Sequence, residues 1–422
     1  MDAIRVRFGV PLLPVLRCVL AIMSLMAFPA ASPAQLIIGQ YEDEAPLRSW
    51  NTFGLATASS LGRGETQLAH ADDCSAAIAN PALLTSLPKF MVSLNGSYSY
   101  ASLYRYSIVN TGVLVTEKNP AIGLNALDFG GISFSSKGWA FALTAALIES
   151  YDRPAASARA DFQGLPYYEI SFGQTGYLRN FNLAVARAFG RSFQAGIGFN
   201  LVRGTLHREV FDRDFSEDIT ISHLVDQHFS GFYLNAGVLV RLTGRLDLAC
   251  VVRTPYDKKT EGQSRLRYQA PRGGTDIAIE AASDDGYRQP WAAGLGVRCA
   301  VSENFRITGD MVYFLWSQYR AEFFGESERR DFRDTFKAGA GGEHSLRLRL
   351  FGRDAAIPLR LGISYDRQPM REPNSAYLNF TFGTGIRWRM VVFDIGALGG
   401  RESGSGHSLK ILRVAASLGI RL

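Results

Sequence analysis

The feature that most constrains the fold is an alternation of apolar residues with small or polar ones, which recurs from residue 90 to residue 422. In the first such segment one side carries large apolar residues: Phe90, Val92, Leu94, Tyr98 and Tyr100. The last segment repeats the pattern: Leu412, Val414, Ala416, Leu418, Ile420 and Leu422. A period of two over about ten residues is the spacing of a β-strand with one apolar face.

The connections between these segments are of two kinds. Short turns lie at residues 135–138, 190–192, 243–245, 302–304, 351–354 and near Arg389. Longer polar stretches lie at 102–120, 152–177, 208–228, 257–287, 320–333, 368–375 and 401–407. The two kinds alternate strictly, which predicts an all-β fold of about 14 strands. An even-stranded antiparallel barrel in a membrane has short turns at one rim and long loops at the other.

Closure of the sheet follows from the solvent. In lipid every backbone N–H and C=O needs a partner within the protein, and only a closed barrel leaves no unpaired edge. A soluble β-sandwich or solenoid also has alternating strands. The strand lengths and the asymmetry of the connections favour a membrane-spanning antiparallel β-barrel, which we predict for residues 89–422. Arg187, on the apolar side near a turn, is expected to reach the membrane interface.

The N-terminus predicts export. Arg5 and Arg7 precede a short apolar stretch that ends in small residues near Ala34, the pattern of a secretory signal peptide over residues 1–34. The full chain has a formal net charge of +6, and removal of the signal peptide leaves 42 − 38 = +4. This mild basicity does not indicate a nucleic-acid partner.

Residues 35–88 lack strand alternation and are too few to build a sizeable core alone. A wide barrel exceeds what inward side chains can fill, so we expect this segment to be a hatch, or plug, inside the lumen. Its motifs are Ser60–Gly64, Ala71-Asp72-Asp73 and Asn80-Pro81-Ala82-Leu83. The predicted hatch residues are Gly62, Asp72, Asp73, Asn80, Pro81, Ala82 and Leu83.

Signs of catalysis or cofactor binding were not found. No GxSxG, HExxH or P-loop motif is present, and the six histidines are scattered. The cysteines form no CxxC pair. We therefore predict no enzyme activity, no catalytic residue, no metal and no cofactor. The glycine pairs Gly294/Gly296 and Gly383/Gly385 fall in phase with the lumen side of strands, where they leave space.

The order of these motifs resembles that of the FadL/TodX family of outer-membrane transporters for hydrophobic compounds. Later segments agree with it: Arg253-Thr254-Pro255, Trp316–Tyr319, Asp334–Lys337 and Leu361–Asp366. The resemblance implies a fourteen-stranded barrel with a hatch that takes up long-chain fatty acids or similar molecules. Family members release ligand sideways beside a kinked third strand. Here that strand is expected to end near Tyr151, Asp152 and Pro154, although the family's glycine at the kink is not evident.

Ten arginines fall on the predicted lumen face, where charge is less costly than against lipid: Arg241, Arg253, Arg298, Arg306, Arg347, Arg349, Arg360, Arg387, Arg413 and Arg421. Asp247, Asp310 and Asp394 share that side. Arg253, Arg298 and Arg347 are predicted to contact a ligand carboxylate. The alternative, favoured for any single arginine, is an Arg–Asp network that braces the barrel against the hatch.

The long connections contain an expected capture patch for apolar ligand: Phe211, Phe215, Ile219, Ile221 and Leu224. The alternative is that these side chains pack on one another. We predict a monomeric outer-membrane channel whose partners are a fatty-acid-like ligand and outer-membrane lipid. Two other functions stay open at this point: a non-transport barrel that acts as a secretion or envelope scaffold, and an outer-membrane lipase.

Overall fold

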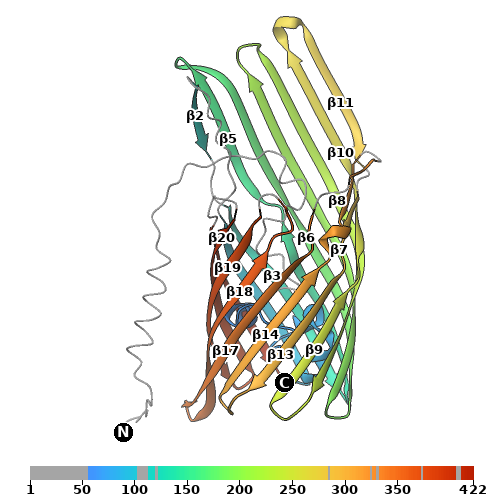
Figure 1. Ribbon diagram of the computed structural model, residues 1–422, viewed down its shortest axis with the longest axis vertical. Coiled ribbons are helices and arrows are strands. Elements are labelled where there is room, and N and C mark those ends of the chain that lie inside the picture. The colour runs from blue at the N-terminus through green and yellow to red at the C-terminus, as the bar shows by residue number, and fades with distance from the viewer. Residues whose placement is uncertain are drawn as a thin grey trace.

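The structure is a computed structural model that describes residues 56–101, 113–118, 122–283, 286–323, 326–328, 332–371, 374–404 and 410–422. The predicted signal peptide, residues 1–34, and the first part of the predicted hatch, residues 35–55, lie outside these ranges. Where the chain is described, it is almost entirely β-strand (Figure 1).

Fourteen strands form a closed antiparallel barrel. They are β1 (Phe90–Ala101), β3 (Ile122–Ser136), β4 (Trp139–Ser150), β6 (Leu165–Phe189), β7 (Phe193–Asp214), β8 (Ile219–Arg241), β9 (Leu246–Arg253), β13 (Ala292–Ala300), β14 (Phe305–Phe314), β17 (Thr335–Leu350), β18 (Arg353–Arg367), β19 (Ala376–Trp388), β20 (Val391–Ser403) and β21 (Lys410–Arg421). Each pairs with the next of these, and β21 pairs with β1 to close the wall. The predicted fourteen-strand barrel is thus confirmed.

The alternation determines which side chains face out. Leu418 is 45% exposed, whereas its neighbour Ser417 is 9% exposed and faces inward. Along β4, Phe141 and Leu143 are exposed and Ala142 is buried between them. Large residues outside and small residues inside are what a wall needs when lipid surrounds it and another segment fills its lumen.

The predicted long loops need a correction, because three of them are mostly strand. The segments 152–177, 208–228 and 257–287 hold the far ends of β6, β7 and β8 together with β5 (Arg153–Phe162), β10 (Tyr256–Ala270) and β11 (Thr275–Ser283). Pairing of β7 with β8 continues to Asp214 and Ile219. Polar residues interrupt the apolar pattern there, but β-pairing depends on backbone hydrogen bonds and continues beyond the lipid.

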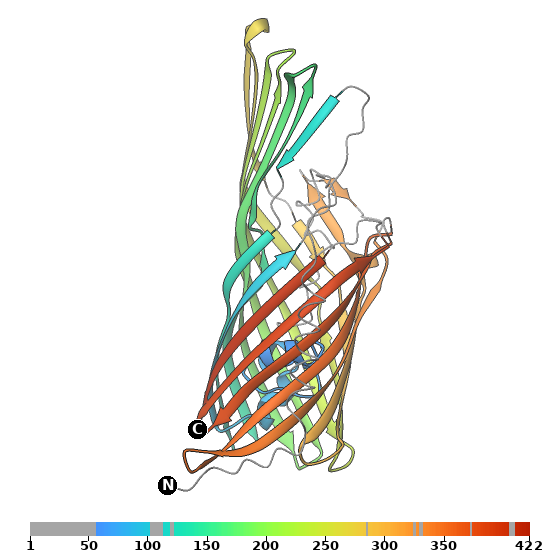
Figure 2. The ribbon, with the colours of Figure 1, turned by 90° about the vertical axis from the view of Figure 1, so that its left-hand side faces the viewer.

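These strands form a sheet, here called the extension, that rises beyond the rest of the rim on one side of the barrel (Figures 1 and 2). β2 (Val113–Lys118) adds to it by pairing with β5. Three shorter strands, β12 (Gly286–Gln289), β15 (Arg320–Phe323) and β16 (Glu326–Glu328), pair beside β10. The short turns all lie at the opposite rim, which is the periplasmic side in barrels of this kind.

Residues 56–88, here called the inner segment, lie within the barrel (Figure 2). They contain two short α-helices, α2 (Ala58–Gly62) and α3 (Ala76–Ala79), and the 3₁₀ helix η1 (Pro81–Ser86). Two further 3₁₀ turns, η2 (Pro271–Gly273) and η3 (Trp316–Gln318), lie in connections. None of the helices in the described ranges has the length and apolar character needed to cross a membrane.

Candidate functional site

A buried ion network joins the inner segment to the barrel wall. Arg63, which is fully buried, donates to Asp72 at 2.5 Å and to Glu343 of β17 at 3.0 Å. Arg360 of β18 donates to Glu343 at 2.7 Å and to Asp394 of β20 at 2.6 Å. Further bonds to these acids come from Arg306, which contacts Glu343, and from Arg387, which lies 2.8 Å from Asp72. Buried charge is stable only when it is paired in this way.

This network identifies what three of the ten predicted lumen arginines do. Arg306, Arg360 and Arg387 brace the wall, as the alternative to ligand contact predicted. Arg63 and Glu343 were not among the predicted site residues. Their pairing joins positions 280 residues apart. The spacing in the sequence gives no sign of such a contact.

The electrostatics of the inner segment favour the paired state. Although burial opposes ionisation, Arg63 and Arg387 hold the pKa of Asp72 well below its usual range. Burial lowers the pKa of His70 to about 4, against the opposing effect of Asp72, so this imidazole is neutral at pH 7. Lys337 of β17 forms a second bridge, 2.9 Å from Glu65.

Lumen-facing glycines make room for the backbone of the inner segment. A Cβ at Gly237 of β8 would lie 2.1 Å from Oδ1 of Asn80, and one at Gly383 of β19 would lie 2.9 Å from Cα of Gly62. Cβ atoms at Gly294 and Gly296 would each lie 2.7 Å from the Leu68 side chain. Gly294, Gly296 and Gly383 therefore leave room for the inner segment to lie close to the wall, in line with their predicted lumen position.

The Asn80-Pro81-Ala82-Leu83 motif anchors one side of the inner segment. The Asn80 side chain accepts from the N–H of Ala82 at 3.1 Å and donates to the carbonyl of Leu68 at 2.7 Å. From the wall, Asn235 donates to the carbonyls of Ala77 and Ile78. Of the other predicted hatch residues, Asp73 accepts from the Thr57 hydroxyl at 2.6 Å.

An aromatic cluster lines the lumen toward the extension. Its buried members are Tyr151, Leu178, Val202, Leu206, Phe229, Tyr233, Tyr287 and Tyr319. The Nζ of Lys258 lies among the rings, 4.3 Å from the centroid of Phe229 and 4.5 Å from that of Tyr287, and donates to the Tyr151 hydroxyl at 3.0 Å. This cluster combines apolar area with a buried lysine amine held over aromatic faces.

The wall is open in its backbone pairing beside this cluster. The ladder between β3 and β4 ends at Phe129 and Ala146. Beyond that point β3 continues to pair with β1 down to Ile122, and β4 pairs with β6. Register shifts in both outer ladders, at Asp128 in β3 and Ile148 in β4, mark β-bulges at the same height. A bulge bends its strand, so the two bulges turn β3 and β4 apart.

The predicted strand end therefore lies at this gap. Tyr151 is buried and follows β4, and Asp152 accepts from the N–H of Gly176 at 2.8 Å. Pro154 lies at the start of β5. The family resemblance implies a glycine at the kink. The chain instead has a bulge at Ile148, which an apolar residue permits and which therefore leaves no clear sequence signal.

The three arginines predicted to contact a carboxylate lie apart. Arg253 lies 5.8 Å from the ring centroids of both Tyr233 and Phe314, at the edge of the aromatic cluster. Arg298 is held by Asp247 at 2.5 Å. Arg347 is 65% exposed, 3.8 Å from Glu303, toward the rim with short turns. Of these three arginines, only Arg253 lies at the aromatic cluster.

The predicted capture patch is divided between the two faces of the extension. Phe211 and Leu224 lie on the outer face, because they are in phase with the lipid-facing residues of β7 and β8. Ile219 and Ile221 lie on the inner face, and Phe215 lies in the turn between the strands. The five residues thus do not form one patch.

The inner face of the extension carries a different apolar row. Ile221, Tyr268 and Ile277 are aligned across β8, β10 and β11, and Leu266 aligns with Ile279. Ile277 and Ile279 are 48% and 53% exposed. Along β8 this face continues through Val225 and Phe229 into the aromatic cluster. In the membrane-spanning part of the wall the outer face is apolar. In the extension the apolar row lies on the inner face, so the pattern there is reversed.

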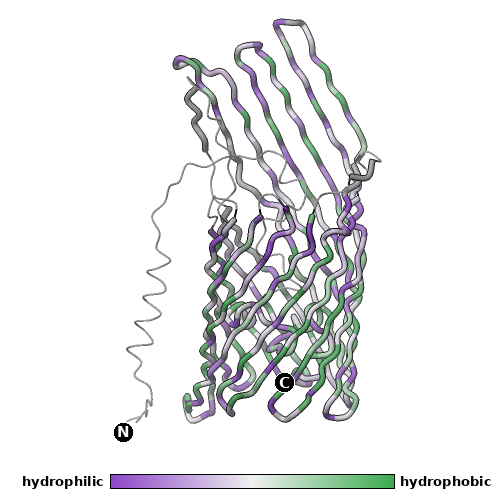
Figure 3. The backbone as a smooth tube through the Cα atoms, viewed as in Figure 1, coloured by the Kyte–Doolittle hydropathy of each residue, from purple (hydrophilic) through white to green (hydrophobic). Residues whose placement is uncertain are grey.

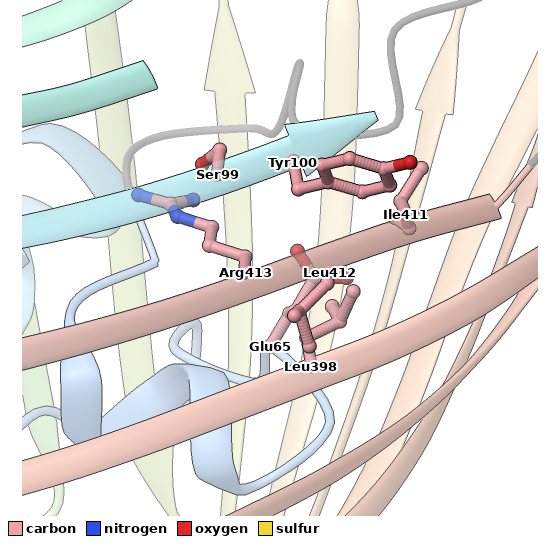
Figure 4. A pocket seen from close by; sticks show the side chains of 7 residues that line it. All are labelled: Glu65, Ser99, Tyr100, Leu398, Ile411, Leu412 and Arg413. Carbon is pink, nitrogen blue, oxygen red and sulfur yellow. The ribbon is translucent and has the colours of Figure 1, made fainter. Parts of the chain in front are cut away.

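A small pocket lies where the inner segment meets the closing seam of the barrel (Figure 4). Ser99 and Tyr100 of β1, Leu398 of β20 and residues 411–413 of β21 line it, together with Glu65. Arg413 also lies 3.0 Å from Asp128, at the bulge of β3. Among the described residues, no group of His, Cys, Asp or Glu side chains is arranged to hold a metal ion.

The comparisons with known proteins agree with this geometry. Residues 49–378 match the family of outer membrane protein transport proteins (OMPP1/FadL/TodX). Among curated proteins no sequence match was found. Three crystal structures are similar. A FadL homologue of Pseudomonas aeruginosa has a TM-score of 0.63 and 14% identity, and the match covers 87% of this chain and 99% of that one. The toluene transporters TbuX of Ralstonia pickettii (TM-score 0.59, 13% identity) and TodX of P. putida (TM-score 0.61, 12% identity) each match over 89% of this chain and 99% of their own. At these identities the structures support the fold.

Proposed function

The chain belongs to the family of outer membrane protein transport proteins (OMPP1/FadL/TodX), and from that membership we propose a passive channel that admits hydrophobic molecules and releases them sideways through the wall. It is an outer-membrane β-barrel for transport of hydrophobic compounds, not an enzyme. The observation that carries the lateral route is the end of the β3–β4 ladder beside the aromatic cluster.

Capture is assigned to the inner face of the extension. Its row of Ile221, Tyr268 and Ile277 leads along β8 to the aromatic cluster, which we propose as the ligand chamber, while the outer face carries ion pairs such as Arg267–Asp276 at 2.8 Å. An apolar molecule gains free energy by leaving water for such a surface, at about 25 cal/mol per Å² of apolar area buried. This replaces the patch centred on Phe211 as the proposed site of capture.

The chamber is proposed to hold a ligand with a long apolar part and an acidic end, such as a long-chain fatty acid. The ring faces of the aromatic cluster supply apolar contact. Arg253, at the edge of those rings, supplies charge that would bind a carboxylate, and the buried amine of Lys258 supplies a hydrogen-bond donor. A hydrocarbon would use the same rings without these polar groups, as the toluene transporters in the comparison suggest.

The inner segment is proposed to be part of the hatch, whose proposed limits are residues 35–88. Its contacts reach β8, β17, β18 and β19, on different sides of the lumen. The inner segment lies below the proposed chamber, so the ligand would leave by the shorter route through the gap between β3 and β4. Since ligand moves down a gradient into the bilayer, no energy source is required.

The proposal is tested by uptake of labelled oleate, dodecane and glucose into cells that lack their own route for oily compounds. Expression of the chain should raise uptake of oleate and dodecane and leave glucose uptake unchanged. Arg253→Met should reduce oleate uptake more than dodecane uptake. Equal entry of all three compounds would describe a water-filled pore, and no gain for either oily compound would reject the channel.

A further inference from the structure

The outer wall carries a row of cations at the base of the extension, here called the cationic row: Arg179 of β6, Arg203 of β7 and Lys259 of β10. Arg179 is directly opposite Arg203 in the β6–β7 ladder. Ser230 of β8 is opposite both Arg203 and Lys259, so the three cations lie at one height. All three are exposed.

The row gathers like charge that the described protein does not balance. Directly opposed residues of antiparallel strands have neighbouring side chains, and like charges there repel each other. Within the described ranges, Arg179, Arg203 and Lys259 form no ion pair; Arg179 instead lies 4.9 Å from the ring of Tyr177. Among the described residues, Asp257 and Glu261 flank Lys259 two positions away along β10, and Asp257 also lies 3.9 Å from Arg288. An external anion would relieve the repulsion.

Its height places the row at the edge of the lipid. Directly below Arg179, Arg203 and Ser230 on the same face are Phe181, Leu201 and Phe232, each more than 40% exposed. Directly above it on the same face are Tyr177, Thr205 and His228, which carry hydroxyl or ring nitrogen groups. At the other end of β6, Arg187 lies over the ring of Trp139 at 4.8 Å. The eight residues from Arg187 to Arg179 span about 27 Å along the strand, or roughly 20 Å along a tilted wall, close to the height of a lipid-facing apolar band.

We propose that the cationic row is a binding site for the phosphate groups of outer-leaflet lipid. Phosphate suits the site because guanidinium groups bind its oxygens in paired, charge-assisted hydrogen bonds. With strands about 4.8 Å apart, Arg203 and Lys259 are separated by roughly 10 Å across Ser230, so an extended headgroup reaches both. A protein partner is not favoured, since the row lies where lipid headgroups already surround the barrel.

The row also explains an asymmetry of the fold. The extension rises from β6, β7, β8 and β10; Arg179, Arg203 and Lys259 lie on β6, β7 and β10, and Ser230 of β8 lies between the last two. A lipid held at its base would fix the height of the capture face above the membrane. The assignment does not depend on transport, since a barrel with no cargo would bind the same lipid.

The test compares full-length mature protein with the double variant Arg179→Gln/Arg203→Gln. Native mass spectrometry would count bound diphosphoryl lipid A, and titration would give its Kd. We expect binding to weaken at least tenfold in the variant and, for the wild type, to fall as salt rises. The matched control is Arg213→Gln/Arg267→Gln, which removes two outer-face charges nearer the tip and should leave binding unchanged.

Three results would overturn the assignment: equal binding by the double variant, equal loss in the control, or equal binding of lipid A whose phosphates have been removed. Competition by millimolar inorganic phosphate would show a site for free phosphate and reject the lipid as its occupant. Should the double variant fail to fold, Lys259→Gln serves in its place, with an expected loss of two- to threefold. No change in that variant would also reject the site.

Discussion

Replacing Arg63 with methionine should release the inner segment from the barrel wall. The guanidinium of Arg63 is fully buried between Asp72 and Glu343, at 2.5 and 3.0 Å, so its removal leaves both carboxylates short of a partner. Breaking a buried ion network by loss of one member costs about 3–5 kcal/mol. Because each 1.4 kcal/mol is a factor of ten, the seated state should lose roughly a hundredfold to several thousandfold in population.

The barrel itself should persist in this variant, since its closed ladder does not include Arg63. Single-channel conductance in planar bilayers is the assay, and Arg63→Met should show frequent large openings that are rare in the wild type. Adding Asp72→Asn should recover part of the closed population, because Asp72, left with Arg387 as its charged partner, is then neutral. The control is Arg347→Met, whose side chain is 65% exposed. Wild-type conductance from Arg63→Met would refute the bracing role.

Four further outcomes are expected. Leu418→Arg, if mid-membrane, should cost about 2–4 kcal/mol in urea unfolding from vesicles and Ser417→Arg less; equal costs would invert the assigned faces. Gly237→Ala puts a Cβ 2.1 Å from the Asn80 side chain, so it should raise conductance at a cost of about 1–3 kcal/mol; a silent change would reject the close contact. Because burial lowers the pKa of His70 to about 4, a released inner segment binds a proton between pH 6.5 and 4 that the seated one does not. Seating should therefore weaken by up to about 3 kcal/mol over that window as pH falls, and His70→Asn should abolish this part of the pH dependence of conductance. Deletion of residues 35–87 should raise conductance, and an unchanged value would remove the inner segment from any role as a plug.

The sequence predicted the barrel well because its rule is local. A period of two, with lipid on one side, fixes the facing of a residue such as Leu418 without knowledge of its neighbours. The six short turns, which mark strand ends on one rim, were likewise visible. The lumen-side glycines were found for the same reason, although their contacts with Gly62 and Asn80 were not.

The long-range parts of the site were not predictable in this way. Arg63 and Glu343 meet across 280 residues, and nothing in either segment indicates the other. The bulges at Asp128 and Ile148 insert single residues without a sequence signature. The extension was mistaken for loops because its apolar side is reversed above the membrane, where a polar stretch can still be a paired strand.

The most direct measurement of the lateral route is a staple across the gap. In a variant without native cysteines, Leu127→Cys and Leu147→Cys, both on the outer face, would be joined by a short bis-maleimide, and oleate uptake measured before and after. The control joins Ile132→Cys to Leu143→Cys, which are already opposite each other in the ladder. The account predicts that the first staple stops uptake and the second does not. Undiminished uptake with the gap stapled would contradict it.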